Sequence, residues 1–388
     1  MSVLRTRGVG GPRHDDAEPF VIQGDVFILV LIVLACGWIW NSSFRSRPPP
    51  VAAEAMQRQL DACPFTIRQL NKTTYLIREL DRFDENPHIY VKKHTQTAPD
   101  GRTATLLLVT DTGCGTTTQS RTSKTGRWDI RSFIDHHLNS TLSIPYLVLL
   151  SHCHYDHILG LPSILHPAKT PGPPPPHTLI ASSAYAPAFL EPRATLRTHS
   201  LCKSMNLHCP AYTTSLWAGH NAPLVVAHPR LSIVPMRVPA ITLHTPGHTP
   251  DSLSWFDVEE RVLFVGDAVY EGAPILFPSE GDLSVWWRSL GMLIQFVGER
   301  NSEEGERIVL AAGHGVVGAD ALECLVAVRA FIARVLRDEV RFEEQGFKRG
   351  ERFGGWGEEG GRFSLGAPVR VVQEGREGIP EEEWRGDV

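Results

Sequence analysis

The sequence predicts a compact domain of layered helices and sheets between residues 62 and 344. Two runs of aliphatic residues predict buried strands, TATLLLVTDTG at 103–113 and IPYLVLLSHCH at 144–154. Apolar residues spaced at i, i+3, i+4 and i+7 predict one amphipathic helix within 283–297, and a second is predicted over 319–342. Buried strands that alternate with amphipathic helices are typical of a layered α/β architecture.

The composition is that of a globular protein with an excess of histidine. Of 388 residues, 42% are hydrophobic and 21% are charged, and the formal net charge is -5. A negative net charge supplies no global attraction for nucleic acid, so we expect no nucleic-acid partner. The 17 histidines raise the question of how many converge on one site.

The N-terminal part predicts a membrane anchor ahead of the domain. Residues 1–19 are rich in Gly, Arg and Asp, which is typical of disorder. Within 20–44, the uninterrupted apolar run VFILVLIVLACGWIW at 26–40 favours a single-pass transmembrane signal anchor. A cleaved signal peptide or a soluble segment, and hence a secreted or cytoplasmic protein, stays an alternative. The proline-rich stretch in 45–61 predicts a linker.

Further elements follow in chain order. A helix is predicted at 129–138, a proline loop at 166–177, and a strand running into a helix at 178–190. Residues 345–388 are rich in Gly, Glu and Arg, and they predict a largely disordered tail with one short strand at 367–372.

The cysteines indicate no zinc knuckle and no disulfide framework. There are seven of them, and none forms a C-x-x-C pair. Cys202 and Cys209 can pair if the chain is exported, whereas reduced buried thiols are the alternative.

Four predicted strands end in side chains that ligate metals. The strand at 144–154 enters the sequence SHCHYDH, which places three histidines and one aspartate within six residues. Later apolar runs lead to His248 in AITLHTPGH, to Asp267 in RVLFVGD and to His314 in RIVLAAGH. Loops at the ends of buried strands are where a layered sheet protein builds its site, so these donors predict a metal centre.

These motifs resemble those of the metallo-β-lactamase superfamily. HCHYDH fits the pattern H-x-H-x-D-H, and TPGHT, FVGD and AAGHG follow in the order seen in that family. The resemblance covers residues 65–340. It implies an α+β fold of the four-layer αβ/βα sandwich type, with two sheets face to face and a dinuclear metal site along one edge.

The resemblance also implies which residues hold the metals. His152, His154 and His248 would hold the first ion, Asp156, His157 and His314 the second, and Asp267 would bridge the two. Nitrogen-rich ligation favours two divalent Zn²⁺ ions, and Mn or Fe is also compatible.

Several neighbouring residues are expected to support the site. We expect the Cys153 side chain to point away from the ligands, and we expect Asp111 to form hydrogen bonds instead of coordinating metal. Ser151 and Thr249 are similar candidates. We assign Asp156 and Tyr270 as catalytic, with Tyr270 as a candidate oxyanion or substrate donor and a core tyrosine as the alternative.

The ligand set predicts hydrolysis of a small-molecule ester or thioester by a metal-bound hydroxide. The stretch GDAVYEG at 266–272 resembles glyoxalase II-like hydrolases, in the branch that includes an acyl-coenzyme A thioesterase. An acyl thioester is therefore favoured as substrate. A lactonase or β-lactamase on the same metals is the alternative, and a non-catalytic membrane-anchored scaffold is less favoured because every ligand position is filled.

Overall fold

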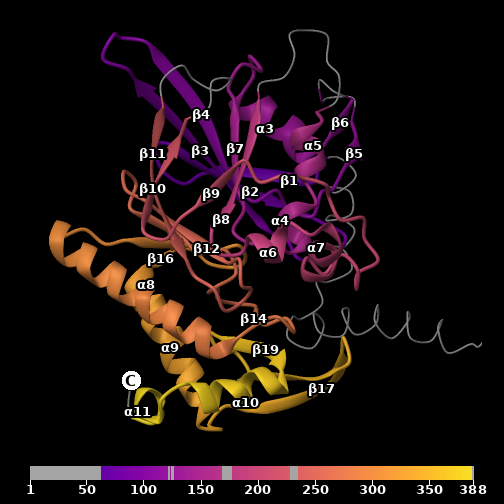
Figure 1. Ribbon diagram of the computed structural model, residues 1–388, viewed down its shortest axis with the longest axis vertical. Coiled ribbons are helices and arrows are strands. Elements are labelled where there is room, and N and C mark those ends of the chain that lie inside the picture. The colour runs from indigo at the N-terminus through magenta and orange to yellow at the C-terminus, as the bar shows by residue number, and fades with distance from the viewer. Residues whose placement is uncertain (1–62, 121–122, 124–125, 168–176, 228–234, 387–388) are drawn as a thin grey trace, which may run out of the picture. The chain divides into compact units, whose positions relative to one another are not determined.

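The computed structural model describes residues 63–386, apart from 121–122, 124–125, 168–176 and 228–234 (Figure 1). The predicted N-terminal disorder at 1–19, anchor segment at 20–44 and linker at 45–61 lie outside these residues. Within the described part of the chain, no helix is both long and apolar enough to cross a membrane.

The first sheet has seven strands in the order β1-β2-β3-β4-β7-β8-β9. Strands β1 to β4 are antiparallel neighbours, whereas β4, β7, β8 and β9 run parallel. The predicted strands at 103–113 and 144–154 are its centre. The bounds are β1 (Phe65–Gln69), β2 (Thr74–Glu79), β3 (His88–Thr97), β4 (Thr103–Thr110), β7 (Tyr146–Leu149), β8 (Thr178–Ser183) and β9 (Leu216–Ala218).

The second sheet has six strands in the order β10-β11-β12-β13-β15-β16. It is antiparallel except for the parallel pair β13 and β15. The three later strands that were predicted to end in metal-type donors all belong to it. The bounds are β10 (Ala222–Val226), β11 (Met236–His244), β12 (Leu253–Asp257), β13 (Val262–Phe264), β15 (Val309–Ala311) and β16 (Val317–Asp320).

Alternation of side chains along the strands builds a sandwich. In β4, Leu106 and Leu108 face the second sheet, whereas Leu107 and Val109 face the opposite way. In the second sheet, Trp255 joins the core between the sheets and Phe256 joins the outer core. Successive strand residues point to opposite faces, so each sheet is apolar on both sides and must be covered by helices. The expected four-layer αβ/βα arrangement is therefore present.

Helices cover the outer face of each sheet (Figure 1). The predicted helix at 129–138 forms as α3, whose N-terminus is capped by a reciprocal pair of hydrogen bonds between Asp129 and Ser132. On the second sheet, α8 begins after the Asp282 cap and ends at Gly305 with a φ of 70°. The bounds are α3 (Ile130–Leu138), α4 (Tyr155–Ile158), α5 (Leu161–Leu165), α6 (Pro187–Leu190), α7 (Arg193–His199), α8 (Leu283–Glu304) and α9 (Ala321–Leu336). Strands β5 (Thr118–Gln119) and β6 (Arg127–Trp128) form a small separate ribbon.

The prediction that the tail beyond residue 344 is largely disordered is wrong for the described residues. A third sheet forms there in the order β14-β19-β18-β17, followed by two helices. The strand predicted at 367–372 is instead the end of β19 and the start of α10. The bounds are β14 (Pro274–Leu276), β17 (Phe342–Lys348), β18 (Glu351–Gly357), β19 (Ser364–Pro368), α10 (Val369–Gly378) and α11 (Glu381–Trp384).

This C-terminal sheet is stable because its apolar residues join the outer core on α8 and α9. Trp356, Leu365 and Val371 are buried in the same cluster as the α8 tryptophans. The predicted second helix also ends at Leu336 instead of 342, because the chain turns there to enter β17. The polar composition of the tail reflects its solvent face, not an absence of core.

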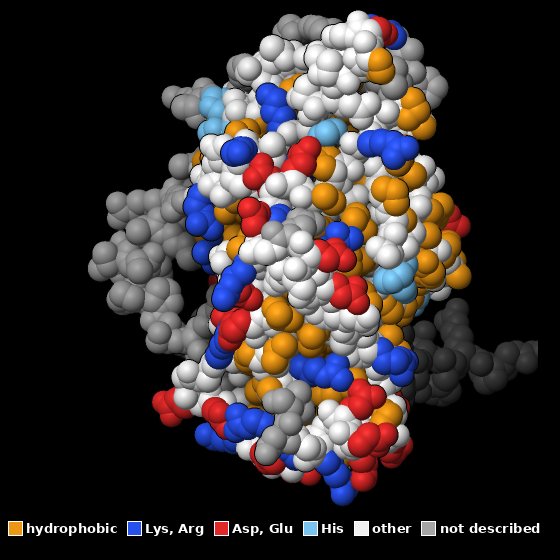
Figure 2. Space-filling model, turned by 90° about the vertical axis from the view of Figure 1, so that its left-hand side faces the viewer, with side chains coloured by type: hydrophobic (Ala, Val, Ile, Leu, Met, Phe, Trp, Pro, Cys, Tyr) orange, Lys and Arg blue, Asp and Glu red, His pale blue; other side chains and the backbone are white. Residues whose placement is uncertain are grey.

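A buried ion pair joins the two large sheets. The Nζ atom of Lys92 in β3 lies 2.9 Å from Oδ2 of Asp257 in β12, and both side chains are fully buried. Thr73 accepts a further hydrogen bond from Nζ at 2.9 Å. At the surface, by contrast, acidic and basic side chains are interspersed over the face in Figure 2.

Candidate metal centre

The sequence places seven donor side chains in turns at one edge of the sandwich. Immediately after β7, Ser151–His154 runs into the short helix α4, so that Asp156 and His157 lie on its single turn. The turn between β11 and β12 carries His248, and its end is attached to the loop after β7 because Leu253 N donates to Ser151 O at 2.7 Å. Asp267 follows β13 and His314 follows β15, which run parallel and therefore end together. All seven residues assigned from the sequence meet here.

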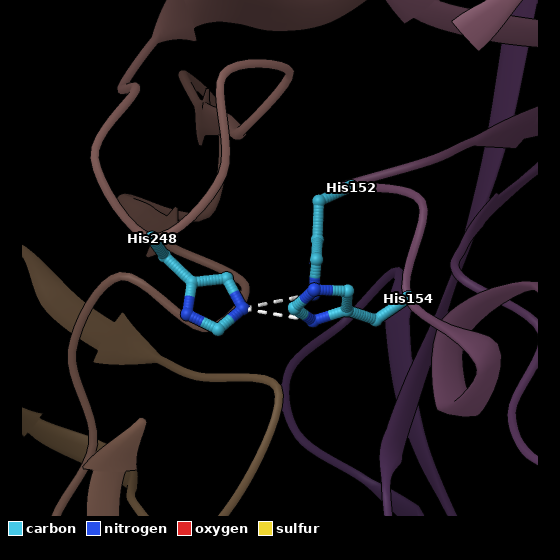
Figure 3. A group of neighbouring side chains, drawn as sticks. All are labelled: His152, His154 and His248. Carbon is cyan, nitrogen blue, oxygen red and sulfur yellow. Dashed lines mark hydrogen bonds between the residues drawn. The ribbon is translucent and has the colours of Figure 1, made fainter. Parts of the chain in front are cut away.

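Three histidines form the first donor group (Figure 3). The Nε2 atom of His248 lies 3.2 Å from Nε2 of His152 and 3.0 Å from Nδ1 of His154. Burial lowers the pKa of His152 and of His154 well below the usual range, so both rings are neutral and each has a nitrogen lone pair to offer. Three neutral imidazoles facing one point are the ligand set that Zn²⁺ prefers when one position is left for water.

Two carboxylates and two histidines form the second donor group, Asp156, His157, Asp267 and His314. The Oδ2 atom of Asp156 lies 3.3 Å from Nε2 of His157 and 3.1 Å from Nε2 of His314. Oδ1 of Asp267 lies 3.3 Å from Nε2 of His157. Within each group, the ligand atoms lie within 4.8 Å of one another.

Asp267 faces both groups. Its Oδ2 atom lies 4.0 Å from His248 Nε2 in the first group and 3.6 Å from His314 Nε2 in the second. A carboxylate in this position can give one oxygen to each of two ions. The backbone makes room for it, because a Cβ added at Gly313 would come within 2.3 Å of Asp267 Oδ1.

Asp111 orients two of the histidines from outside the centre. Its Oδ2 accepts a hydrogen bond from His157 Nδ1 at 2.9 Å and another from Ser151 Oγ at 2.7 Å. Because the Ser151 hydroxyl donates to Asp111, it can accept the bond from His152 Nδ1, which lies 3.1 Å away. One carboxylate thus fixes the tautomer of a histidine in each group, as expected for Asp111 and Ser151.

Two backbone carbonyls orient two further histidines, and neither carbonyl was predicted from the sequence. His248 Nδ1 donates to Leu276 O at 2.6 Å, and His314 Nδ1 donates to Glu85 O at 2.9 Å. Leu276 belongs to β14, which pairs with β19 of the C-terminal sheet. A carbonyl acts here through the path of the chain and not through its side chain, so no residue type signals it.

Several buried polar atoms in the centre make no hydrogen bond within the described part of the chain. In the second group, His157 Nε2 and Asp267 Oδ1 make no hydrogen bond, although they lie 3.3 Å from each other. In the first group, His154 Nε2 also makes none, while Nδ1 of the same ring faces His248. An unsatisfied buried polar atom costs about 1–3 kcal/mol, so unpartnered atoms gathered at one point indicate that something binds there.

The charges of the second group also favour a cation. Burial would lower the pKa of His314, but the carboxylates of Asp267 and Asp156 outweigh it and raise the pKa to about 9. Burial likewise opposes ionisation of Asp156, yet His157 and His314 hold the pKa of that carboxyl well below its usual range. The carboxylates therefore require positive charge at this point, which imidazolium protons or a divalent cation can supply. The residues present fit a pair of divalent ions.

The other candidates fall around the centre. Tyr270 is buried, its ring lies 5.6 Å from that of His314, and its hydroxyl accepts a hydrogen bond from Leu276 N at 3.2 Å. Cys153 points away from the ligands into a cluster with Leu190 and Leu196, as expected. Thr249 bonds to Ser252 at 2.9 Å and so supports the turn that carries His248.

Comparisons with known proteins match this chain to one superfamily model and to one curated relative. The family model described as "Metallo-beta-lactamase superfamily" matches residues 102–302. A curated relative from Aspergillus versicolor, "Putative transcription factor avaE", is 31% identical over 291 residues, which is 72% of this chain and 79% of that protein.

Two solved structures are similar at lower identity. A beta-lactamase domain protein from Burkholderia ambifaria is 15% identical with a TM-score of 0.46, covering 70% of this chain and 74% of that chain. A metallo-beta-lactamase family protein from Thermus thermophilus is 18% identical with a TM-score of 0.43, covering 71% of this chain and 85% of that chain.

Proposed function

Because this chain belongs to the metallo-β-lactamase superfamily, we propose that it is a dinuclear metal-dependent hydrolase that cleaves a thioester. The observation that carries the proposal is the pair of donor groups, both of which Asp267 faces. A protein that has lost catalysis has no reason to keep such a costly arrangement of buried charges. A purely scaffolding role is therefore less favoured.

The first ion would be held by His152, His154 and His248, and the second by Asp156, His157 and His314. Asp267 would contact both. When bound, such a pair of ions supplies a Lewis acid and lowers the pKa of water. Zn²⁺ suits the histidine-rich first group, while Mn²⁺ and iron are also compatible with the mixed second group.

The protein's own contribution is to orient these ligands and to bind the substrate. Asp111 holds a proton on His157 Nδ1, which keeps Nε2 free to coordinate. Tyr270 accepts a hydrogen bond from Leu276 N, which leaves its own hydroxyl proton available as a donor. We assign that proton to the carbonyl oxygen of the substrate, where it would stabilise negative charge in the transition state.

A thioester is favoured because of its leaving group. A thiolate leaves without needing much protonation, whereas an amide nitrogen needs a general acid. Apart from the ligands, the acidic groups beside the centre are Tyr270, whose pKa burial raises far above neutrality, and Glu85, whose pKa burial raises to about 7. The Glu85 carboxyl group accepts a hydrogen bond from the Tyr155 hydroxyl, so we do not assign it to protonate a leaving group. Lactone or β-lactam opening on the same site is the second candidate.

The printed name of the Aspergillus relative suggests a role in transcription. If this chain bound DNA directly, it would need a basic surface to contact the phosphates. Its net charge is -5, and basic side chains on the face in Figure 2 alternate with acidic ones. We therefore favour a small-molecule substrate over nucleic acid.

The metal proposal is tested by elemental analysis of purified protein, before and after dialysis against a strong chelator. We expect about two divalent ions per chain, with hydrolysis lost on chelation and restored by added metal. Protein that is active with no bound metal would refute it.

The substrate is tested by turnover of the metal-loaded enzyme on a panel of compounds. The panel contains a long-chain acyl thioester, a glutathione thioester, a simple lactone and a chromogenic β-lactam. We expect the acyl thioester to have the highest kcat/KM. If the lactone or β-lactam exceeds both thioesters tenfold, which is about 1.4 kcal/mol of transition-state preference, the thioesterase assignment fails.

A further inference from the structure

Two cysteines outside the metal centre lie side by side at the ends of one short loop. The loop follows α7, and it is closed by a backbone hydrogen bond from Leu207 N to Cys202 O at 2.7 Å. This bond brings the chain back on itself, so that Cys209 returns to the neighbourhood of Cys202. Both are free cysteines, and Cys209 packs against the buried cluster that contains Cys202.

The two thiols differ in access. Cys202 is fully buried, in a cluster with Cys114 and Tyr155, whereas Cys209 is partly exposed. The Sγ atom of Cys209 also lies 3.6 Å from the hydroxyl of Ser200. A reagent from solvent can therefore reach Cys209 but not Cys202.

The two thiols also differ in acidity. The hydrogen bond from the Cys202 thiol lowers the pKa of Cys209 to about 6, and Arg193 and Arg197 in α7 act in the same direction. The same hydrogen bond raises the pKa of Cys202 far above its usual range. Cys209 is thus the thiolate and Cys202 the protonated partner at neutral pH.

We propose that Cys209 and Cys202 form a dithiol–disulfide couple that reacts with small-molecule disulfides, with Cys209 as the attacking thiol and Cys202 as the resolving thiol. The Cys209 thiolate attacks one sulfur of the small disulfide, forming a mixed disulfide and releasing one small thiolate. Cys202 then loses its proton and attacks Cys209 Sγ, which releases the second small thiolate. The protein dithiol is oxidised by two electrons and the small disulfide is reduced to two thiols.

The loop is compatible with this change. An S–S bond is about 2.05 Å long, so the two side chains must approach more closely than a hydrogen bond requires. Residues 203–206 are exposed and lie outside the regular elements, which lets the loop adjust. The couple does not depend on the hydrolase proposal, because neither cysteine belongs to a donor group.

The couple is tested on the full-length, metal-loaded protein equilibrated in glutathione buffers of different oxidised-to-reduced ratios. After acid quenching and alkylation, peptide mass spectrometry counts free thiols and locates the bonds. In wild-type protein we expect a Cys202–Cys209 disulfide whose fraction follows the buffer ratio. Cys202→Ser should instead accumulate one glutathione adduct on Cys209, and Cys209→Ser should give neither product.

Cys63→Ser is the matched control, because Cys63 is the other partly exposed thiol among the described residues. We expect it to behave as wild type. The proposal is overturned if the wild-type pair stays reduced at every ratio, or if the adduct in Cys202→Ser forms on another cysteine. An unfolded variant is recognised by circular dichroism, and the wild-type titration alone then decides.

Discussion

Replacing Asp111 with asparagine should weaken both metal sites, although Asp111 would touch neither ion. The substitution suits the backbone, because Asp111 has a φ of 64° and asparagine tolerates this left-handed conformation better than most residues. Its size is also unchanged. Any effect therefore comes from the hydrogen bonds of the carboxylate.

The magnitude follows from those bonds. Asp111 accepts from Ser151 N at 2.7 Å, from Ser151 Oγ at 2.7 Å and from His157 Nδ1 at 2.9 Å. An amide has only one oxygen, so in either orientation its NH₂ group faces a donor. If His157 moves its proton to Nε2 to relieve this contact, it can no longer coordinate. Loss of such a supporting partner typically reduces metal affinity about 10–100-fold, or about 1.4–2.8 kcal/mol.

The assay is a stepwise Co²⁺ titration followed by visible absorption, with a chromophoric chelator as competitor, which gives two dissociation constants. Ser151→Ala is the matched comparison. It removes the link to His152 and leaves the Asp111–His157 bond in place, so only one constant should rise. Circular dichroism reports whether each variant is folded.

The reasoning is refuted if Asp111→Asn leaves both constants within threefold of wild type. It is also refuted if Ser151→Ala raises both constants as much as Asp111→Asn does, because the two histidines would then not depend on Asp111 by separate routes.

Three further predictions concern the centre, the sandwich and the N-terminal segment. Asp267→Ala should lose at least one ion by elemental analysis and lower kcat by orders of magnitude, since Asp267 faces both donor groups; near-native rate and metal content would show it has no bridging role. Lys92→Met should lower the free energy of unfolding, measured in urea, by about 3–5 kcal/mol because it leaves Asp257 charged and buried. The double variant Lys92→Met with Asp257→Leu should recover most of that stability, and a Lys92→Met variant as stable as wild type would contradict the prediction. Deletion of residues 1–48 should leave metal content unchanged, because every donor residue lies beyond residue 150; a deleted form that cannot fold would contradict this.

The strands and the donor set could be predicted because their signals are local. Leu106 to Val109 are apolar without interruption, as a strand covered on both faces must be, and the histidines follow such runs directly. Each donor is a side-chain atom, so its ability to bind metal can be inferred from the residue type.

The C-terminal sheet was missed because its signal is diluted. Glycines and exposed Glu and Arg side chains separate its buried residues, among them Phe353, Trp356 and Leu365. The composition of a segment averages over its buried and its exposed face. Here the exposed polar residues dominated that average, and disorder was predicted. The carbonyls of Leu276 and Glu85 could not be predicted for a different reason: every residue has a carbonyl, and only the fold decides where it points.

The pairing of β14 with β19 has a consequence for how the protein is made. The last of the seven donors, His314, leaves the ribosome well before Ser364–Pro368, the strand that β14 pairs with. Until that strand is synthesised, the strand whose Leu276 carbonyl orients His248 lacks its pairing partner. A nascent chain can therefore carry every ligand before it contains the strand that pairs with β14, and the first site reaches its final support only after Pro368 is synthesised.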